Sequence, residues 1–229
     1  MEAIVLAGGL GTRLASVISD LPKPMAPVRG RPFLEYIFRY LGKNGIGRAI
    51  LSVGYKWESI NARFGDRFEG VELVYSVENE PLGTGGAIKR AMRLVLGDKV
   101  FIINGDTFFN VPLQKLEDEF AEEGKLMLAL KKMRHFDRYG CVEVDDRGMV
   151  TAFTEKGYRE AGNINGGIYL VRNDIFESFV TEEKFSFETF MEEHFKVLKI
   201  QALLLDSFFI DIGIPEDYAK AQIELSDRL

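Results

Sequence analysis

An α/β fold is first indicated by the stretch Ala3-Ile4-Val5-Leu6-Ala7-Gly8-Gly9-Leu10-Gly11-Thr12-Arg13-Leu14. Its first five residues form a short apolar run, which is typical of a buried strand. The glycines that follow lack Cβ atoms, so backbone N–H groups can approach a polyanion closely. Arg13 adds a planar cation that can hold two phosphate oxygens at once. A strand that runs into such a loop predicts a phosphate-binding turn.

Neither of the two best-known glycine motifs is complete here. The P-loop pattern G-x-x-x-x-G-K-[ST] is absent, and Leu14 stands where the dinucleotide fingerprint requires its third glycine. The glycines alone are explained equally well by a tight turn without a ligand. The segment from Arg13 to Arg31 contains four basic residues and one acid, which favours a ligand. Within it, Lys23 lies between two prolines that restrain its backbone, and we expect its amine to stay mobile.

Size and composition limit the class of protein. A chain of 229 residues with 46% hydrophobic residues suffices for one domain with a sizeable core. A net charge of −6 argues against non-specific nucleic-acid binding. Because no apolar run reaches the roughly 18 residues of a membrane span, and the first strand begins at once, we expect no membrane segment and no signal peptide. A single cysteine, Cys141, suits the reducing cytoplasm and is expected in the core.

Strands and helices alternate along the first half of the chain. The predicted strands cover residues 3–7, 49–53, 71–75 and 100–103, and the predicted helices cover 32–41, 57–64 and 87–95. This alternation indicates a parallel sheet with helices on both faces, and loops at its carboxyl edge share one crevice.

The second half of the chain is richer in predicted strands. These cover residues 126–130, 140–144, 149–154, 163–170, 202–205 and 208–213, with helices at 113–123, 187–194 and 215–223. This part of the chain could supply the floor and wall of a site for a second substrate.

A second glycine-rich turn, Glu80-Pro81-Leu82-Gly83-Thr84-Gly85-Gly86, precedes the helix at 87–95. Guanine presents two neighbouring donors, N1–H and N2–H₂, and one carboxylate can accept from both. Glu78 or Glu80 is therefore a candidate for selecting guanine. Each of them singly is explained equally well as a solvated loop carboxylate.

Two apolar strands carry an acid. Asp106 follows the strand at 100–103, and Asp211 lies within Phe208-Phe209-Ile210-Asp211-Ile212-Gly213. A buried carboxylate is costly unless it is paired or bound to a metal. Because Mg²⁺ prefers one or two carboxylates with phosphate oxygens and water, the two acids are candidate ligands of one shared cation. A turn-forming Asn-Gly-Asp explains Asp106 equally well.

The sequence contains no Ser-His-Asp set and no cysteine with a catalytic partner, which favours phosphoryl or nucleotidyl transfer, where positioning and charge neutralisation suffice. A phosphate-monoester nucleophile would need no strong base, since its second pKa is about 6.

The chain resembles the sugar-1-phosphate nucleotidylyltransferases over essentially its whole length. The resemblance is carried, in order, by residues 8–14, Pro22-Lys23-Pro24-Met25, residues 80–86, Asn104-Gly105-Asp106-Thr107, Glu155-Lys156, Asn165-Gly166-Gly167-Ile168-Tyr169 and Asp211-Ile212-Gly213. It implies a Rossmann-like α/β nucleotidyltransferase fold of the GT-A-like kind: a mixed, mainly parallel sheet flanked by helices, with a small β-rich sugar-binding region. It also implies one domain over residues 1–229, in which 1–110 bind the nucleotide and 111–229 the sugar phosphate.

The resemblance further implies Mg²⁺ and an in-line attack of a sugar 1-phosphate on the nucleotide α-phosphate, with release of pyrophosphate. The implied catalytic residues are Arg13, Lys23 and Asp106, and the implied metal ligands are Asp106 and Asp211. The implied nucleotide-binding residues are Leu6, Ala7, Gly8, Gly9, Gly11, Thr12, Arg13, Glu80, Leu82, Gly83, Thr84, Asn104 and Gly105. The implied sugar-phosphate-binding residues are Tyr139, Gly140, Glu155, Lys156, Asn165 and Gly166.

Within the family, residues 80–87, 136–140 and 208–218 look like those of members that transfer GMP from GTP to D-glycero-α-D-manno-heptose 1-phosphate. That likeness implies that the product is GDP-heptose, which is made for the synthesis of surface polysaccharide. Mannose, glucose or N-acetylmuramic acid 1-phosphate remain alternative acceptors, and a non-catalytic nucleotide-sugar sensor is an alternative of another class. Homo-oligomers are compatible with the sequence.

Overall fold

The computed structural model describes residues 1–9, 14 and 21–225. Four residues of the predicted phosphate loop, Leu10, Gly11, Thr12 and Arg13, lie outside the described residues. No helix of the described part of the chain combines the length and apolar composition needed to cross a membrane.

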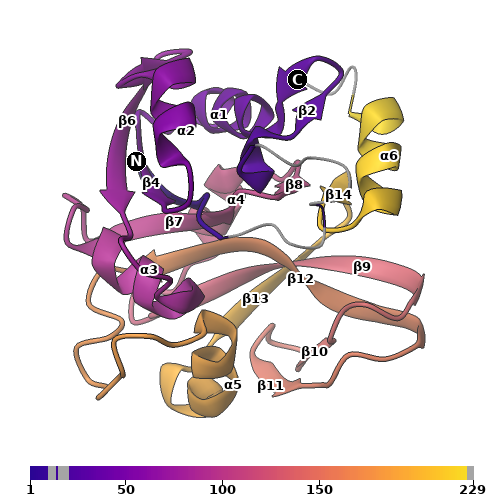
Figure 1. The fold of residues 1–229 in the computed structure, drawn as a ribbon. Helices are drawn as coiled ribbons and strands as arrows, with labels where there is room; N and C mark the ends of the chain where they lie inside the picture. Colours follow the sequence, from indigo (N-terminus) through magenta and orange to yellow (C-terminus); the bar gives the residue numbers. More distant parts are fainter. Residues whose placement is uncertain (10–13, 15–20, 226–229) are drawn as a thin grey trace.

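One eight-stranded sheet forms the centre of the fold (Figure 1). Its order is β13–β9–β12–β7–β1–β4–β6–β5. In that order the strands span Gln201–Leu205, Leu126–Phe136, Arg159–Arg172, Lys99–Asn104, Glu2–Leu6, Arg48–Val53, Val71–Val77 and Arg67–Phe68. β7, β1, β4 and β6 are parallel neighbours, while β12 runs antiparallel to both β7 and β9. The mixed, mainly parallel sheet predicted from the sequence is confirmed.

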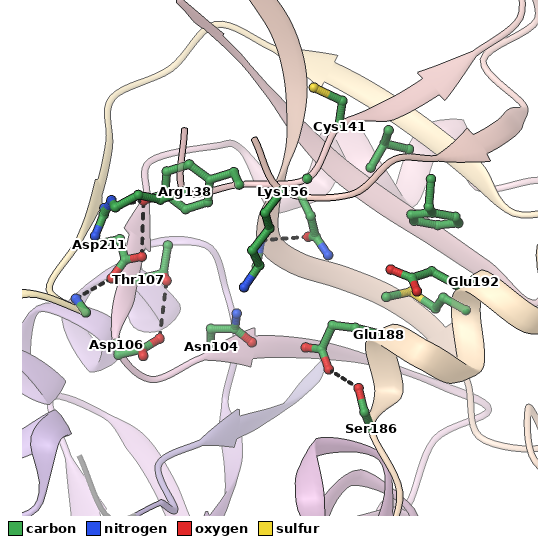
Figure 2. Close-up of a pocket in the computed structure, with 18 of the residues that line it drawn as sticks. Asn104, Asp106, Thr107, Arg138, Cys141, Lys156, Ser186, Glu188, Glu192 and Asp211 are labelled. Atoms are coloured by element: carbon green, nitrogen blue, oxygen red, sulfur yellow. Dashed lines mark hydrogen bonds between the residues drawn. The ribbon is translucent and has the colours of Figure 1, made fainter. Parts of the chain in front are cut away.

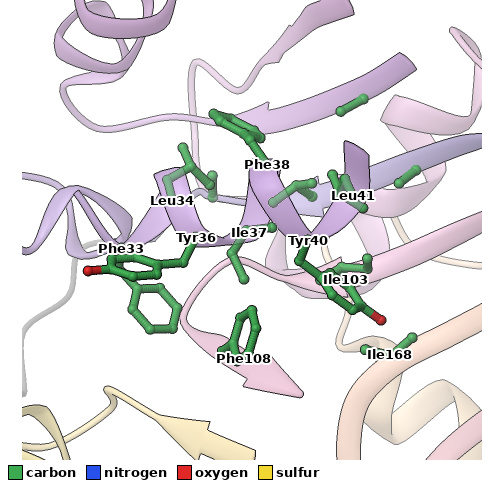
Figure 3. Packing of buried hydrophobic residues seen from close by; sticks show 14 of the residues in the cluster. Phe33, Leu34, Tyr36, Ile37, Phe38, Tyr40, Leu41, Ile103, Phe108 and Ile168 are labelled. Atoms are coloured by element: carbon green, nitrogen blue, oxygen red, sulfur yellow. The ribbon is translucent and has the colours of Figure 1, made fainter. Parts of the chain in front are cut away.

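Helices cover both faces of this sheet (Figure 1). α1 (Phe33–Lys43), α2 (Trp57–Phe64), α4 (Leu113–Glu119) and α6 (Pro215–Glu224) contribute to one buried cluster, and α3 (Gly83–Met92) and α5 (Phe187–Leu198) contribute to the other. Strand β1 serves both clusters, because Ala3 and Val5 point to the first and Ile4 to the second. Figure 3 shows α1 of the first cluster, with Phe38 and Leu41 among its buried side chains.

The order of the strands places a crevice at one edge of the sheet. The chain adds β4 and β6 on one side of β1 and then crosses to add β7 on the other side. In such sheets ligands bind at this switch point, outside the carboxyl ends of the strands. Leu6 and Asn104 are register partners there, and Gly105 donates its N–H to the Leu6 carbonyl at 3.0 Å. A Cβ at Gly105 would lie 2.6 Å from that carbonyl oxygen, so the two strand ends meet only because this residue is glycine.

Three two-stranded sheets accompany the central sheet. β8 (Thr107–Phe109) pairs with β14 (Phe209–Asp211), β10 (Val142–Val144) with β11 (Val150–Phe153), and β2 (Pro27–Val28) with β3 (Arg31–Pro32). The last hairpin and the 3-10 helix η2 (Lys23–Met25) lie between the predicted strand at 3–7 and the predicted helix at 32–41, in a segment for which the sequence predicted no regular structure. Prolines restrict helix and inner strands, but they are compatible with a short edge hairpin.

The second half departs from expectation mainly in the length of its strands. β9 reaches Phe136 and β12 begins at Arg159, so both extend beyond the predicted ranges 126–130 and 163–170. The added residues alternate between polar and apolar only weakly. They are held as strands because β9 and β12 continue to pair with each other from Arg159–Phe136 onward.

The glycine-rich turn at the start of α3 packs against residues 183–185. A Cβ at Gly83 would lie 2.5 Å from the Phe185 carbonyl oxygen, and one at Gly86 would overlap the Glu183 carbonyl oxygen. Gly85 donates its N–H to the Phe185 carbonyl at 2.9 Å, and Phe185 donates to the Leu82 carbonyl at 3.0 Å. These glycines thus join the turn to the segment that leads into α5.

Gly86→Ala tests this packing. Alanine inside a helix normally stabilises by about 1 kcal/mol relative to glycine. Here the Glu183 backbone would have to move, so we expect a loss of about 1–3 kcal/mol and a fall in Tm of several degrees, measured by circular dichroism. Gly47→Ala is the matched control, because nothing lies within 4 Å of its Cβ position and we expect no such loss. A Tm for Gly86→Ala at or above that of the parent would contradict the packing argument.

Candidate active site

A cleft of about 820 Å³ opens at the carboxyl edge of β7. It is lined on one side by Lys23, Asn104 and Asp106, and on the other by residues of the second half of the chain. The predicted site residues that it brings together are Lys23, Asn104, Asp106, Tyr139, Gly140, Glu155, Lys156, Asn165 and Asp211. The cleft therefore unites the predicted metal ligands with most of the predicted sugar-phosphate side chains.

Asp106 and Asp211 are brought together by the pairing of β8 with β14. Thr107 and Asp211 are register partners, and Ile212 donates its N–H to the Asp106 carbonyl at 3.0 Å. The Lys23 ammonium forms an ion pair with Oδ2 of Asp106. The side chain of Lys23 is only 14% exposed. The amine that we expected to be mobile is therefore engaged inside the cleft.

The Asp211 carboxylate lies in a costly environment. Burial raises the pKa of Asp211, and the negative charge of Asp106 raises it further. The Lys23 ammonium opposes this shift in pKa, as do two donors, the N–H of Gly213 on Oδ1 and the hydroxyl of Tyr139 on Oδ2 at 3.2 Å. A buried carboxylate beside a second carboxylate is an arrangement that a cation stabilises.

The donor set suits a hard cation only in part. Among the described residues, no group of three or more His, Cys, Asp and Glu side chains could hold a metal. Two carboxylates fit Mg²⁺, which binds one or two of them and completes its shell with phosphate oxygens and water. The residues therefore fit a metal that arrives with a phosphate substrate better than one held by the protein alone.

Lys156 projects into the middle of the cleft. Figure 2 shows its side chain directed between Asn104 and Glu188, with Asp106 and Asp211 at one end and Glu192 at the other. Asn165 is held by two contacts: its Nδ2 donates to the Tyr169 hydroxyl at 2.8 Å, and its Oδ1 accepts the Gly167 N–H at 3.0 Å.

Gly166 does not line the cleft. It is buried, and a Cβ there would overlap the Phe109 ring. Its neighbour Gly167 lines the cleft instead, with a φ of 72° that favours glycine and with a Cβ position 2.8 Å from Nδ2 of Asn104.

The structure also places several residues in the cleft that the sequence argument did not assign. They are Thr107, Arg138, Cys141, Val142, Phe153, Thr154, Gly167, Tyr169, Ser186, Glu188, Met191, Glu192, Phe209, Gly213 and Ile214. Cys141, expected in the core, is half-buried at the wall of the cleft, one residue before β10. Glu188 and Glu192 are four residues apart on α5, a spacing that could have indicated one helix face.

Near the turn before α3, which is predicted to bind the nucleotide, most of the polar side chains are hydrogen-bonded to other residues of the protein. The carboxylate of Glu78 accepts hydrogen bonds from the Ser52 hydroxyl at 2.9 Å and from the Leu82 N–H at 3.2 Å. Thr84 donates its hydroxyl to Glu188 at 2.6 Å and accepts from the Phe187 N–H at 2.8 Å. Glu80 is exposed. Of the two acids considered for guanine, Glu78 is therefore engaged in holding the turn, and Glu80 is the one whose side chain faces solvent.

At the end of β1, Leu6 is half-buried and Ala7 is buried, while Gly8 and Gly9 are exposed. Gly9 has a φ of 105°, which strongly favours glycine. A Cβ at Gly8 would lie 3.2 Å from Oε1 of Glu78, so the first turn and the second approach each other closely.

Asp211→Asn tests the electrostatic cost at the centre of the cleft. Because the folded pKa of Asp211 lies above its usual value of 3.8, ionisation of this group weakens the fold as the pH rises. Asparagine carries no charge at any pH. We therefore expect the Tm of Asp211→Asn minus that of the parent to increase from about pH 4 to about pH 7, measured in chelator-treated buffer. A difference that is constant or falls with pH would contradict this reading.

Comparison with known proteins gives the family. Residues 2–228 match the family described as "Nucleotidyl transferase". Two proteins named D-glycero-alpha-D-manno-heptose 1-phosphate guanylyltransferase are similar to this chain. The one from Campylobacter jejuni is 54% identical, with 95% of this chain and 97% of the relative covered. The one from Aneurinibacillus thermoaerophilus is 55% identical, with 98% of both chains covered.

A crystal structure of HddC from Yersinia pseudotuberculosis complexed with GMP-PN is also similar, with a TM-score of 0.84 and 38% identity. The alignment covers 96% of this chain and 97% of the other. With a family match over nearly every residue and relatives more than half identical, this chain belongs to the nucleotidyl transferase family.

Proposed function

We propose that this protein transfers GMP from GTP to D-glycero-α-D-manno-heptose 1-phosphate, yielding GDP-heptose and pyrophosphate. The observation that carries the proposal is the 54–55% identity to two heptose 1-phosphate guanylyltransferases over 95–98% of the chain. The cleft supports it, because cationic and acidic groups of the first half face a wall of polar side chains from the second. We propose accordingly that residues 1–110 hold the nucleotide and 111–229 the sugar phosphate.

In the proposed reaction an oxygen of the sugar 1-phosphate bonds to the α-phosphorus of GTP. The bond from that phosphorus to the oxygen bridging it to the β-phosphate breaks, and pyrophosphate leaves. Lys23 reaches the cleft with its ammonium and is assigned to the charge around the α-phosphate. Arg13 is assigned to the departing phosphates. No protein base is required, since the phosphate monoester is already largely dianionic at pH 7.

We assign Asp106 and Asp211 as the ligands of Mg²⁺, on the strength of their pairing across β8 and β14. A bound Mg²⁺ would neutralise charge that develops on the phosphate oxygens. Lys23 pairs with Asp106 in this structure, so its ammonium lies next to the carboxylate that we assign to the metal.

The sugar phosphate is assigned to Lys156, whose ammonium is in the middle of the cleft. Glu155 and Asn165 are assigned to sugar hydroxyls, with Tyr139 and Gly140 on the same wall. Gly166 acts on this set indirectly, by packing under it against Phe109.

The nucleotide is assigned to the turn after β1 and the turn before α3. The residues are Leu6, Ala7, Gly8, Gly9, Gly11, Thr12, Arg13, Glu80, Leu82, Gly83, Thr84, Asn104 and Gly105. Among them Glu80 is the candidate for the guanine edge, because its carboxylate is exposed whereas that of Glu78 holds the Leu82 N–H.

We further propose a cytoplasmic location, since the lone cysteine suits a reducing compartment.

Pyrophosphate release tests the proposed substrates. We expect the highest kcat/KM for GTP with the heptose 1-phosphate when GTP, ATP, UTP, CTP and dTTP are each crossed with heptose, mannose, glucose and N-acetylmuramic acid 1-phosphates. Another preferred pair would overturn the assigned base or sugar and leave the transfer chemistry. No release with any pair would favour a nucleotide-sugar sensor.

Lys156→Met tests the assignment of the sugar phosphate. A charge-assisted hydrogen bond contributes about 1.5–3 kcal/mol, so we expect the KM for the sugar 1-phosphate to rise about 10- to 100-fold. The KM for GTP should stay near that of the parent. Lys132→Met, on β9 and away from the cleft lining, is the matched control. A rise in the KM for GTP alone would place Lys156 on the nucleotide instead.

A further inference from the structure

A chain of polar contacts runs from α6 to the carboxylate of Asp211. Asp217, in the first turn of α6, forms an ion pair with Arg138. Arg138 donates from Nη2 to the Tyr139 hydroxyl at 3.0 Å, and that hydroxyl is 3.2 Å from Oδ2 of Asp211. Arg138 and Asp211 line the cleft (Figure 2), and Tyr139 lines it as well. The resemblance assigns Tyr139 to the sugar phosphate, but its hydroxyl is committed elsewhere.

The donor and the acceptor of each hydrogen bond between Arg138, Tyr139 and Asp211 follow from the protons that these groups carry. A guanidinium can only donate, so the Tyr139 oxygen must be the acceptor of the contact with Arg138. A phenol carries one proton, and the remaining contact of the hydroxyl is with Asp211. The proton of Tyr139 is therefore directed to Oδ2 of Asp211. With the Gly213 N–H on Oδ1, each oxygen of this carboxylate accepts one hydrogen bond from the protein.

We propose that Tyr139, oriented by Arg138 and Asp217, is a positioning residue that fixes the orientation of the Asp211 carboxylate for binding a cation. The proposal rests on the assignment of Asp211 as a metal ligand. Partners that hydrogen-bond to a ligating carboxylate typically change metal affinity by about 10- to 100-fold when removed. Arg138, although it lines the cleft, acts here through Tyr139.

The ring of Tyr139 is fixed by its neighbours. It lies edge-on to Phe209 at 6.2 Å between ring centroids and is tilted against Phe136 at 6.4 Å. The guanidinium of Arg138 lies over the same ring, 5.3 Å from its centroid. Phe209 belongs to β14, two residues before Asp211, so one of the side chains that fix the Tyr139 ring lies on the same strand as the Asp211 carboxylate.

α6 couples this arrangement to the Lys23 side of the cleft. Its Tyr218 hydroxyl and its Gln222 amide both donate to the Pro27 carbonyl, at 2.5 and 2.8 Å. Pro27 opens β2, four residues after Lys23. One helix therefore holds both the arginine that orients Tyr139 and the hairpin that follows the Lys23 segment.

Calorimetric titration of GTP, with and without Mn²⁺ and without any sugar 1-phosphate, tests the proposal. The measured quantity is the factor by which Mn²⁺ increases the affinity for GTP. We expect Tyr139→Phe, which keeps the ring and loses only the hydroxyl, to reduce this factor about tenfold or more, with little change in metal-free GTP affinity. Arg138→Lys, which keeps a cation beside Asp217, should give a smaller reduction.

Tyr75→Phe is the matched control, because its hydroxyl donates to the Gly65 carbonyl at 2.6 Å and Tyr75 is not part of the cleft. We expect it to leave the Mn²⁺ factor unchanged. Asp211→Asn distinguishes the assignment of Asp211 as a metal ligand from the positioning role of Tyr139. If Asp211→Asn leaves the factor unchanged, the metal assignment fails and the proposal falls with it.

If Asp211→Asn reduces the Mn²⁺ factor and Tyr139→Phe does not, the positioning role alone is overturned. The rival role gives a different kinetic result. A Tyr139→Phe enzyme with an intact Mn²⁺ factor and a raised KM for the heptose 1-phosphate would make Tyr139 a sugar ligand. The expected result is the reverse: a weakened Mn²⁺ factor and a higher Mg²⁺ requirement, with the KM for the sugar 1-phosphate near that of the parent at saturating Mg²⁺.

Discussion

Asp106 and Asp211 lie next to each other inside a cleft, and two carboxylates in that position repel. β8 and β14 impose the approach, since Thr107 pairs with Asp211 and Ile212 donates to the Asp106 carbonyl. The protein offsets part of the cost with Lys23 on one carboxylate and with two hydrogen-bond donors on the other. The remaining electrostatic cost is one that a bound cation would relieve.

The rest of the fold holds the groups around that pair. The crossing from β6 to β7 puts the ends of β1 and β7 side by side, and Gly105 lets them touch. α6 connects the hairpin after Lys23 with Arg138 through separate contacts. The turn before α3 is joined to the segment before α5, so Thr84, on the proposed nucleotide side, contacts Glu188 on the wall of the cleft.

Much of this could be predicted from the sequence because local signals carried it. Apolar runs indicated β1, β4 and β7, and the cost of a buried acid linked Asp106 with Asp211. The features that the sequence did not predict are contacts between residues far apart in the chain. The packing of Gly83 and Gly86 on residues 183–185, and the ion pair of Lys23, join segments about 80 to 100 residues apart, and no local pattern reports such contacts.

The most direct test of the account is an anomalous difference map from crystals grown with GTP and Mn²⁺. The account predicts a single strong peak shared by the carboxylates of Asp106 and Asp211, about 2.1 Å from an oxygen of each. It also predicts that the Lys23 ammonium has moved from Asp106 toward the α-phosphate. Manganese bound only by phosphate oxygens, with Lys23 still paired to Asp106, would contradict it.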